Sequence, residues 1–251
     1  MRIKKSLSFL FLAAILSTSA MAQSSTRDCR EIWNEILANG EIASQYAPLK
    51  FLCGDEFRIK LREVISINRD LGYSGARKVF FSEIDNVNGV VCGVYTGKCI
   101  RTNGIPDPSV MNCEHSWPQS KGASGIAKSD IHHLFPADSQ MNARRSNYPF
   151  CEVADAIYEG MGSALGNSKN GTRCFEPPFN HKGDLSRAMM YFSVRYNKPI
   201  DSEQEEFFRK WSEEDGVSEK ESQRNDAVER AQGNRNPFID VPQFVYLIEN
   251  F

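Results

Sequence analysis

The chain has 251 residues, of which 41% are hydrophobic and 25% charged, and its net charge is −2. This length can form one large domain, or two small ones, with a proper core. The acidic balance excludes a uniformly basic surface, so any face that binds a polyanion must be local.

The first 22 residues have the pattern of an export signal. Arg2, Lys4 and Lys5 give a positive start, an apolar run follows, and Ala20-Met21-Ala22 supplies small residues for cleavage. The run is too short to span a bilayer, and an anchor that stays attached is the alternative. Removing 22 of 251 residues leaves 229, residues 23–251, and 30 basic residues become 27 against 32 acidic ones. We expect one domain, a monomer, in the periplasm or secreted, without membrane contact after cleavage.

The N-terminal part of the mature chain is predicted to be helical before it becomes β-rich. Residues 28–70 favour helix, with the clearest apolar spacing between Asp55 and Asp70. Residues 75–84 form a second amphipathic helical pattern. Residues 89–95 favour a strand that ends at the turn Thr96-Gly97.

The central segment, residues 111–147, is predicted as strand, loop, strand and helix. Residues 111–117 and 131–135 are short strand patterns, and Pro136 is expected to end the second one. Asp138 or Ser139 can then cap a helix that runs through Arg145. Three further helices are expected over residues 184–196, 218–232 and 242–251.

Seven cysteines in an exported chain predict disulfide bonds, and the odd number leaves at least one thiol free or paired between molecules. They occupy positions 29, 53, 92, 99, 113, 151 and 174. Their spacing lacks the close Cys-x-x-Cys pairs of zinc clusters. Proximity in sequence suggests the pairs Cys92–Cys99 and Cys151–Cys174 without fixing the connectivity.

Three side chains of the central segment suit the hydrolysis of a phosphodiester. Such a reaction needs a base for the attacking water and a cation for the developing charge. His115 suits the base because an imidazole titrates near neutrality, and Glu114 and Asn142 offer the oxygen ligands that Mg²⁺ prefers. Adjacent strand residues point to opposite faces, so Glu114 and His115 can serve one site only at a strand end or an irregular turn.

Each of these residues also has a purely structural interpretation. A single histidine is more often a satisfied structural side chain, and Asn142 alone is typical of a helix surface. His132 and His133 are adjacent, so on a strand only one of them faces a given site. We expect His132 to support the site from behind and His133 to pack, with metal ligation as the alternative.

Several motifs occur in an order that resembles the bacterial endonuclease I family. They are residues 112–119 (NCEHSWPQ), 129–136 (SDIHHLFP), 141–148 (MNARRSNY), 175–178 (FEPP), 182–188 (KGDLSRA) and 232–240 (QGNRNPFID). The likeness extends over roughly residues 73–245. It implies an α+β fold, a mainly helical single domain around a ββα-metal (His-Me finger) motif at about residues 111–147.

The resemblance also implies an activity and a role for each site residue. It implies a secreted or periplasmic endonuclease that cuts DNA and RNA with little sequence preference and leaves 5′-phosphate ends. His115 matches the family's general base, Glu114 the metal-binding acid and Asn142 the second metal ligand. Arg145 matches an arginine of the same helix that supports the substrate phosphate. The implied cofactor is one Mg²⁺ ion, with Mn²⁺ or Ca²⁺ as possible replacements.

One stretch departs from the family's pattern. Better-known members have a long insertion after the Glu-His pair, carrying an arginine near the scissile phosphate, and the connection is short here. Lys121, Lys128 or Arg187 is expected to replace that arginine. Arg144 stands where many relatives have an acid, and it either binds substrate or is a solvated surface side chain. Residues 233–240 either contact substrate or, as we favour from their Asn and Gly content, form a packed turn.

Two other functions are compatible with the residues alone. One is a phosphodiesterase for small substrates, and the other is an exported nucleic-acid-binding protein that has lost catalysis. Retention of Glu114, His115 and Asn142 together argues against the loss of catalysis. Cleavage of plasmid compared with a chromogenic diester separates the first from a nuclease, and salt-dependent binding without product would indicate the second.

Overall fold

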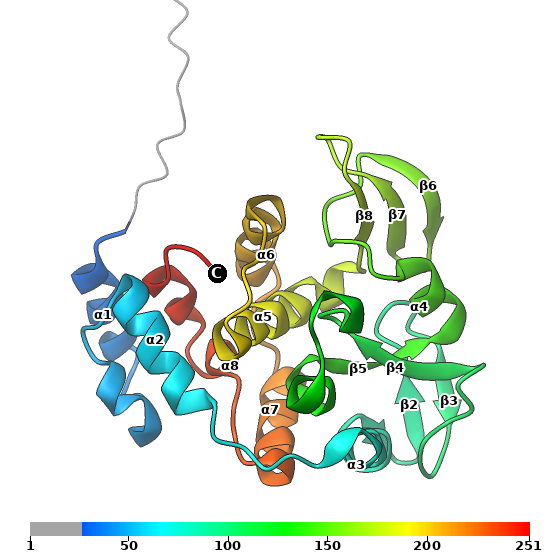
Figure 1. Ribbon diagram of the computed structural model, residues 1–251, viewed down its shortest axis with the longest axis horizontal. Coiled ribbons are helices and arrows are strands. Elements are labelled where there is room, and N and C mark those ends of the chain that lie inside the picture. Colours follow the sequence, from blue (N-terminus) through cyan, green and yellow to red (C-terminus); the bar gives the residue numbers. More distant parts are fainter. Residues whose placement is uncertain (1–26) are drawn as a thin grey trace, which may run out of the picture.

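A long central helix, α5 (Phe179–Tyr196), is surrounded by helices from both ends of the chain, and small sheets lie to one side of it (Figure 1). The computed structural model describes residues 27–251, so the predicted export signal, residues 1–22, lies outside the described part. About half of the described residues are helical and the sheets are antiparallel, which makes the fold α+β in a single domain. Within residues 27–251 no helix is both long and apolar enough to cross a membrane.

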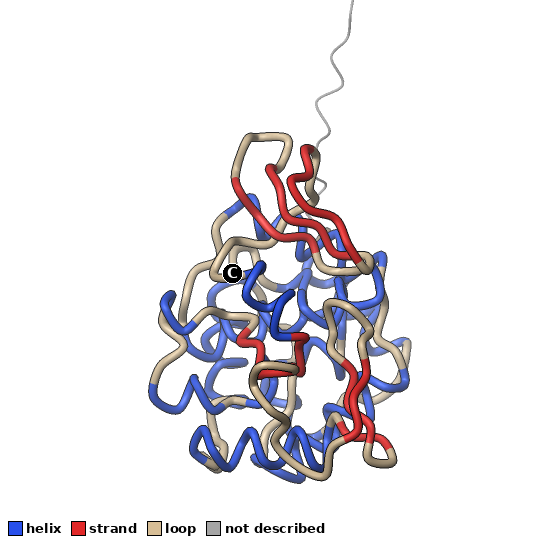
Figure 2. Tube along the Cα trace, turned by 90° about the vertical axis from the view of Figure 1, so that its right-hand side faces the viewer, coloured by secondary structure: helices blue, strands red, loops and turns tan. Residues whose placement is uncertain are grey.

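The helices and strands follow one another in small units along the chain. The other α-helices are α1 (Cys29–Ala38), α2 (Gly54–Ile65), α3 (Gly72–Val79), α4 (Ser139–Arg145), α6 (Ser202–Glu214), α7 (Glu219–Gln232) and α8 (Pro237–Asp240). The strands are β1 (Asn86–Val87), β2 (Val90–Cys92), β3 (Cys99–Arg101), β4 (Met111–His115), β5 (Leu134–Asp138), β6 (Asp155–Gly160), β7 (Ser163–Asn167) and β8 (Arg173–Glu176). They form the sheets β1-β2-β3, β4-β5 and β6-β7-β8, the separate groups of strands in Figure 2.

The N-terminal helical prediction is confirmed in type and corrected in length. The 28–70 segment divides into α1, the short 3₁₀ helix η1 (Ser44–Leu49) and α2, which ends at Ile65 rather than at Asp70. The predicted 75–84 helix begins earlier, as α3, and continues as one π-helical segment, η2 (Phe80–Ile84). Both corrections concern boundaries, where local patterns are weakest.

The central prediction of strand, loop, strand and helix is confirmed, with a shift in the second strand. Residues 131–133 form the 3₁₀ turn η5, and β5 begins only at Leu134. Pro136 does not end this strand, because it pairs with Cys113 in the middle of the β4–β5 ladder. A two-stranded sheet has two edge strands, and there the missing N–H of a proline leaves no ladder bond unmade. Asp138 caps α4 by accepting hydrogen bonds from two backbone N–H groups.

The C-terminal predictions hold for two helices and fail for the last. The predicted 184–196 helix is the second half of α5, which begins at Phe179. Ser218 caps α7 by accepting from the Glu221 N–H, and Gly233 ends the helix at a φ of 88°. Residues 242–251 contain only the short 3₁₀ helix η6 (Pro242–Leu247), since the chain end packs in extended form against the core.

Two apolar clusters hold the elements together. The larger cluster joins α1, α2, α5 and α6 to the C-terminal segment, and Trp33, Phe57, Phe192 and Trp211 lie inside it. The smaller cluster packs α3 and η2 against one face of β4–β5 and includes Met111. Apolar side chains therefore cover one face of the β4–β5 strand pair, and α4 packs against the other face.

The cysteine expectations are confirmed. Disulfides join Cys92 to Cys99 and Cys151 to Cys174, and a third joins Cys29 to Cys53. Cys113 is the free thiol among the described residues.

Asp130 is a buried junction between the centre of the chain and its C-terminal part. Its Oδ2 accepts hydrogen bonds from Arg195, Tyr191 and Tyr196, each at 2.8 Å. Its Oδ1 accepts from the Gln232 amide at 2.8 Å and from the backbone N–H of residue 132 at 3.1 Å. Burial raises the pKa of this carboxyl, but the charge of Arg195, the two neighbouring histidines and the Gln232 hydrogen bond together outweigh burial and hold the pKa well below its usual range.

Candidate active site

The alternation of β4 turns Asn112 and Glu114 toward α4, because residues two apart on a strand share a face. The Asn142 amide donates to the Asn112 side-chain oxygen at 2.6 Å, and the Arg145 Nε lies 3.2 Å from the Glu114 Oε1. Asn142 and Arg145 are three residues apart on α4 and therefore lie on one side of the helix. Asn142 and Glu114 are therefore held at the same face of β4, through Asn112 and Arg145 respectively.

Glu114 is 2% exposed and is held by a tyrosine from another strand region. The Tyr95 hydroxyl donates to its Oε1 at 2.8 Å. Gly93 allows this approach, because a Cβ at that position would lie 2.8 Å from the Asp138 backbone nitrogen. Burial, followed by the Glu114 charge, raises the pKa of Tyr95 well above its ordinary value, so the hydroxyl keeps its proton and donates.

Arg145, only 1% exposed, makes its polar contacts inside the protein. Its two terminal nitrogens donate to the carbonyls of Ser116 at 2.6 Å and Ser146 at 3.0 Å, and its guanidinium lies over the Phe150 ring. Ser146 adopts φ 53° and ψ −124°, which turns its carbonyl back toward Arg145. These contacts fix the positive charge beside Glu114.

His115 is the last residue of β4, so the condition that Glu114 and His115 meet at a strand end is fulfilled. The two side chains still leave opposite faces, and the His115 ring lies near Tyr73 and His133, with ring centroids 5.4 and 5.6 Å away. Among residues 27–251, no hydrogen bond joins this ring to Glu114 or Asn142. Arg145 links the two sides, because its charge acts on both Glu114 and His115.

The backbone assigns the protonation of His115. Its Nε2 lies 3.2 Å from the Lys128 carbonyl, and a carbonyl can only accept, so Nε2 carries the proton. Nδ1 is then unprotonated, and its lone pair accepts a hydrogen bond from the Gln119 side-chain amide at 3.4 Å. Burial, together with the charges of His133, Lys128 and Arg145, lowers the pKa of His115 to about 3. The imidazole is neutral at physiological pH.

His132 and His133 are buried on either side of the same turn. The His132 Nε2 donates to the Asn234 carbonyl at 3.0 Å, and the His133 Nε2 donates to the Ala127 carbonyl at 2.7 Å. The carbonyls of residues 127 and 128 therefore hold the rings of His133 and His115 side by side. Burial lowers the pKa of both His132 and His133 to about 4.

The predicted cationic residues are placed very differently from one another. The Lys128 ammonium lies over the Tyr73 ring, next to His115, at 4.5 Å from the ring centroid. Lys121 ends the 3₁₀ helix η3 (Gln119–Lys121), and Arg144 is exposed and stacks on Tyr158 at 4.2 Å. Arg187 is not brought to the site, because it is buried and bound by both carboxylate oxygens of Glu221 at 2.6 and 2.7 Å.

The donor set fits a hard divalent cation. Within the described chain, the Glu114 Oε2 and the Asn142 Oδ1 have no hydrogen-bond partner, although both residues are held through their other polar atom. Two protein oxygens leave most of the shell to water, as is common for Mg²⁺. No group of three or more His, Cys, Asp or Glu side chains suited to a metal occurs in residues 27–251, which argues against a zinc-type cluster there.

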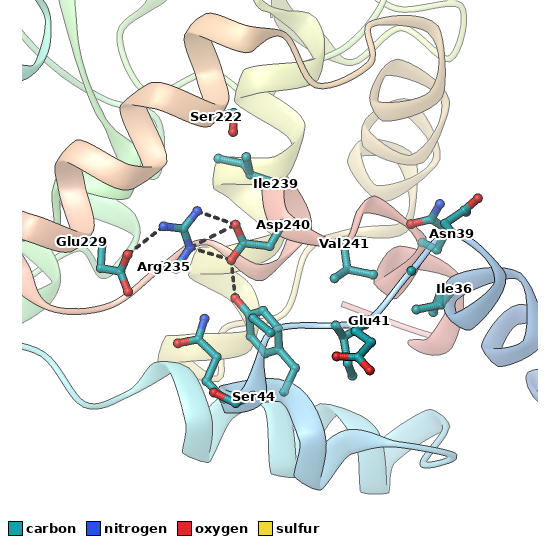
Figure 3. Close-up of a pocket in the computed structure, with 16 residues that line it drawn as sticks. Ile36, Asn39, Glu41, Ser44, Ser222, Glu229, Arg235, Ile239, Asp240 and Val241 are labelled. Atoms are coloured by element: carbon teal, nitrogen blue, oxygen red, sulfur yellow. Dashed lines mark hydrogen bonds and ion pairs between the residues drawn. The ribbon is translucent and has the colours of Figure 1, made fainter.

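A cavity of about 560 Å³ lies away from these residues, between the N-terminal helices and the C-terminal segment. Figure 3 shows Arg235 in its wall bound to Glu229 and Asp240, and the Tyr46 hydroxyl also reaches Asp240. Its one arginine is thus neutralised by carboxylates, so the cavity does not attract a polyanion. Arg235 belongs to the 233–240 segment, whose side chains pack internally as expected, with Asn234 and Asn236 buried.

The sequence patterns missed Tyr95 and Gln119. Tyr95 contacts Glu114 from 19 positions away, and the signal available was Gly93 within a valine-rich, strand-forming run. Gln119 belongs to the motif around His115 but carries no charge or metal-binding group that would mark it.

Comparison with known proteins gives a consistent assignment. The sequence model of the family described as Endonuclease I matches residues 53–243. The extracellular ribonuclease of Bacillus subtilis (strain 168) is 33% identical over 218 residues, which are 76% of this chain and 73% of that protein. The Endonuclease-1 of Buchnera aphidicola subsp. Baizongia pistaciae (strain Bp) is 24% identical over 92% of each chain. An extracellular deoxyribonuclease of Aeromonas hydrophila is 32% identical over 44% of this chain and 49% of its own.

Proposed function

The chain belongs to the endonuclease I family, and from this membership and the site geometry we propose that it is an exported, sequence-nonspecific endonuclease. It hydrolyses DNA and RNA with His115 as general base and leaves 5′-phosphate ends. The observation that carries this proposal is the fixed, neutral His115 imidazole, whose unprotonated Nδ1 lies at the end of the β4–β5 hairpin. Export agrees with three disulfides and with relatives named extracellular.

The residues divide the chemical work as follows. The His115 Nδ1 accepts a proton from the attacking water, whose oxygen bonds to phosphorus while the bond from phosphorus to the 3′ oxygen breaks, and the leaving 3′ oxygen takes a proton from solvent. A substrate phosphate nearby raises the imidazole pKa toward its ordinary value. Glu114 and Asn142 hold Mg²⁺, which supplies positive charge for the developing oxyanion when bound. Tyr95 and Arg145 keep the Glu114 carboxylate in one orientation, and Lys128 is the cation beside the base that replaces the family's inserted arginine.

The decisive experiment incubates the protein with supercoiled plasmid, with RNA and with a chromogenic diester, with Mg²⁺ or with EDTA. We expect both nucleic acids to be cut far faster than the diester, and EDTA to stop cleavage. His115→Ala should abolish cleavage and keep nucleic-acid binding, and Asn142→Ala should weaken the Mg²⁺ response. Gln140→Ala, an exposed change on the same helix, is the control. Cleavage at the wild-type rate by His115→Ala would refute the assignment.

A further inference from the structure

A second cavity of about 400 Å³ adjoins the candidate active site. We call it the Trp117 pocket and define it by Trp117, Lys121, Arg145, Tyr148, Lys198 and Ile200, which line it. Arg145 is common to the pocket and to the site, since it also pairs with Glu114. The helix η3 joins them as well, because Gln119 at its start faces His115 and Lys121 at its end lines the pocket. These two residues are about 4 Å apart along the helix axis.

The pocket has an excess of positive charge. Neither Lys121 nor Lys198 forms an ion pair with any residue of the described chain. The Lys198 ammonium lies against the backbone that follows Lys121, because a Cβ on Gly122 would be 3.3 Å from the Lys198 Nζ. Burial and the charge of Arg145 lower the pKa of Lys121, as expected where cations gather. The one acid in the wall, Asp201, is engaged in capping α6.

Much of the rest of the wall is apolar or aromatic. Trp117 stacks on Phe192 with the ring centroids 4.7 Å apart and the planes 14° from parallel, and its indole N–H donates to the Lys121 carbonyl. Ile200 is buried, and Tyr148 is half-buried at the end of α4. Bases stack on aromatic rings whatever their sequence, and a cavity of this size suits a ligand of nucleotide size.

We propose that the Trp117 pocket binds one nucleotide of the substrate strand, next to the scissile phosphate. The base lies against Trp117 and Tyr148, and its phosphate is held by Lys121 and Lys198. A base can enter only when it is unpaired, so single-stranded nucleic acid is the preferred substrate class. This inference rests on the proposed nuclease function and adds its strand preference.

The test measures binding without catalysis. AMP and inorganic phosphate are titrated separately into the protein in EDTA, with calorimetry as the readout. We expect AMP to bind at least tenfold more tightly than phosphate, because the base contributes. Lys198→Gln should weaken AMP binding about tenfold, the loss of one charge-assisted hydrogen bond. Lys220→Gln, which removes an exposed lysine of α7, should not change it.

The same variants are then compared on a single-stranded RNA and on a duplex of the same length. Lys198→Gln should raise KM for the single strand about tenfold and leave KM for the duplex nearly unchanged. Equal affinities for AMP and phosphate, or equal effects of Lys198→Gln and Lys220→Gln, would refute nucleotide binding in the Trp117 pocket. Cleavage of plasmid in the same preparation would still support the proposed nuclease function. AMP binding without cleavage of any nucleic acid would instead overturn the nuclease and leave the pocket standing.

Discussion

Arg145→Met removes the charge that compensates Glu114 while keeping an apolar side chain of similar length. The two side chains of this pair are 2% and 3% exposed, so solvent cannot replace the lost partner. The substitution also leaves the carbonyls of Ser116 and Ser146 without their donors. The Glu114 carboxylate would keep only the Tyr95 hydroxyl.

The expected cost follows from this burial. Removing one partner of a buried ion pair costs about 3–5 kcal/mol, because the other charge stays desolvated. For a chain of this size, 1 kcal/mol lowers Tm by about 2–4 °C, so a loss of about 3–5 kcal/mol should lower Tm by roughly 6–20 °C relative to the wild type. Adding Glu114→Gln removes the stranded charge, and the double variant should recover about 2 kcal/mol relative to the sum of the single changes.

The assay is equilibrium unfolding in urea of the oxidised protein, in EDTA, for both single variants and the double variant. Arg144→Met is the matched control: it is the neighbouring residue of α4, it is exposed, and it loses only its stacking on Tyr158. The control should change the free energy of unfolding by less than about 1 kcal/mol. A loss below about 1 kcal/mol for Arg145→Met as well would refute the argument that Glu114 depends on this charge.

Three further predictions follow from the site. Mg²⁺ at ten times its Kd should stabilise the wild type by about 1.4 kcal/mol in thermal unfolding but should not stabilise Glu114→Gln. An equal increase in the Tm of both proteins would exclude Glu114 as a ligand. Burial lowers the pKa values of three imidazoles below the unfolded value of about 6.5, to about 3 for His115 and about 4 for His132 and His133. Their contribution to stability is therefore fully present above pH 6.5 and is lost as the pH falls toward the folded-state pKa values. When the pH is lowered below 6.5, the free energy of unfolding, measured in urea at successive pH values, should decrease by up to about 1.4 kcal/mol per pH unit for each imidazole. A free energy of unfolding that stays constant down to pH 5 would contradict this prediction. Ser146→Gly should raise the free energy of unfolding by up to about 1 kcal/mol, because glycine relieves the positive φ of 53°, and a loss would mean that the backbone there is unstrained.

Local chemistry along the chain anticipated much of the framework. The caps at Asp138 and Ser218, the stop at Gly233 and the order of β4, β5 and α4 all depend on neighbouring residues, which a sequence displays directly. Pro136 was misjudged because its cost depends on whether the strand is an edge, and that is set by the number of partners rather than by the residue.

The contacts that orient the site could not be anticipated in the same way. Tyr95 reaches Glu114 because Gly93 allows its own strand region to approach the backbone of Asp138. The hydrogen-bond acceptor for His115 is a backbone carbonyl, which every residue has, so the sequence does not indicate which one accepts. Arg145 and Arg187 are the same residue type as exposed Arg144, yet burial ties both to internal partners. A sequence pattern identifies a candidate side chain, but it does not reveal how deeply that side chain is buried or which groups it contacts.

The junction at Asp130 limits how far this protein can be shortened. Residues 232–251 hold the turn that precedes β5 through two hydrogen bonds. The Gln232 amide donates to Asp130, and the Asn234 carbonyl accepts from the His132 ring. Excising β4, β5 and α4 alone would discard these contacts, and trimming the chain from its carboxyl end would remove the hydrogen-bond partners of Asp130 and His132. The β6–β7 hairpin carries none of these bonds, so shortening should begin there and should keep Ser163, whose hydroxyl donates to the Tyr95 carbonyl.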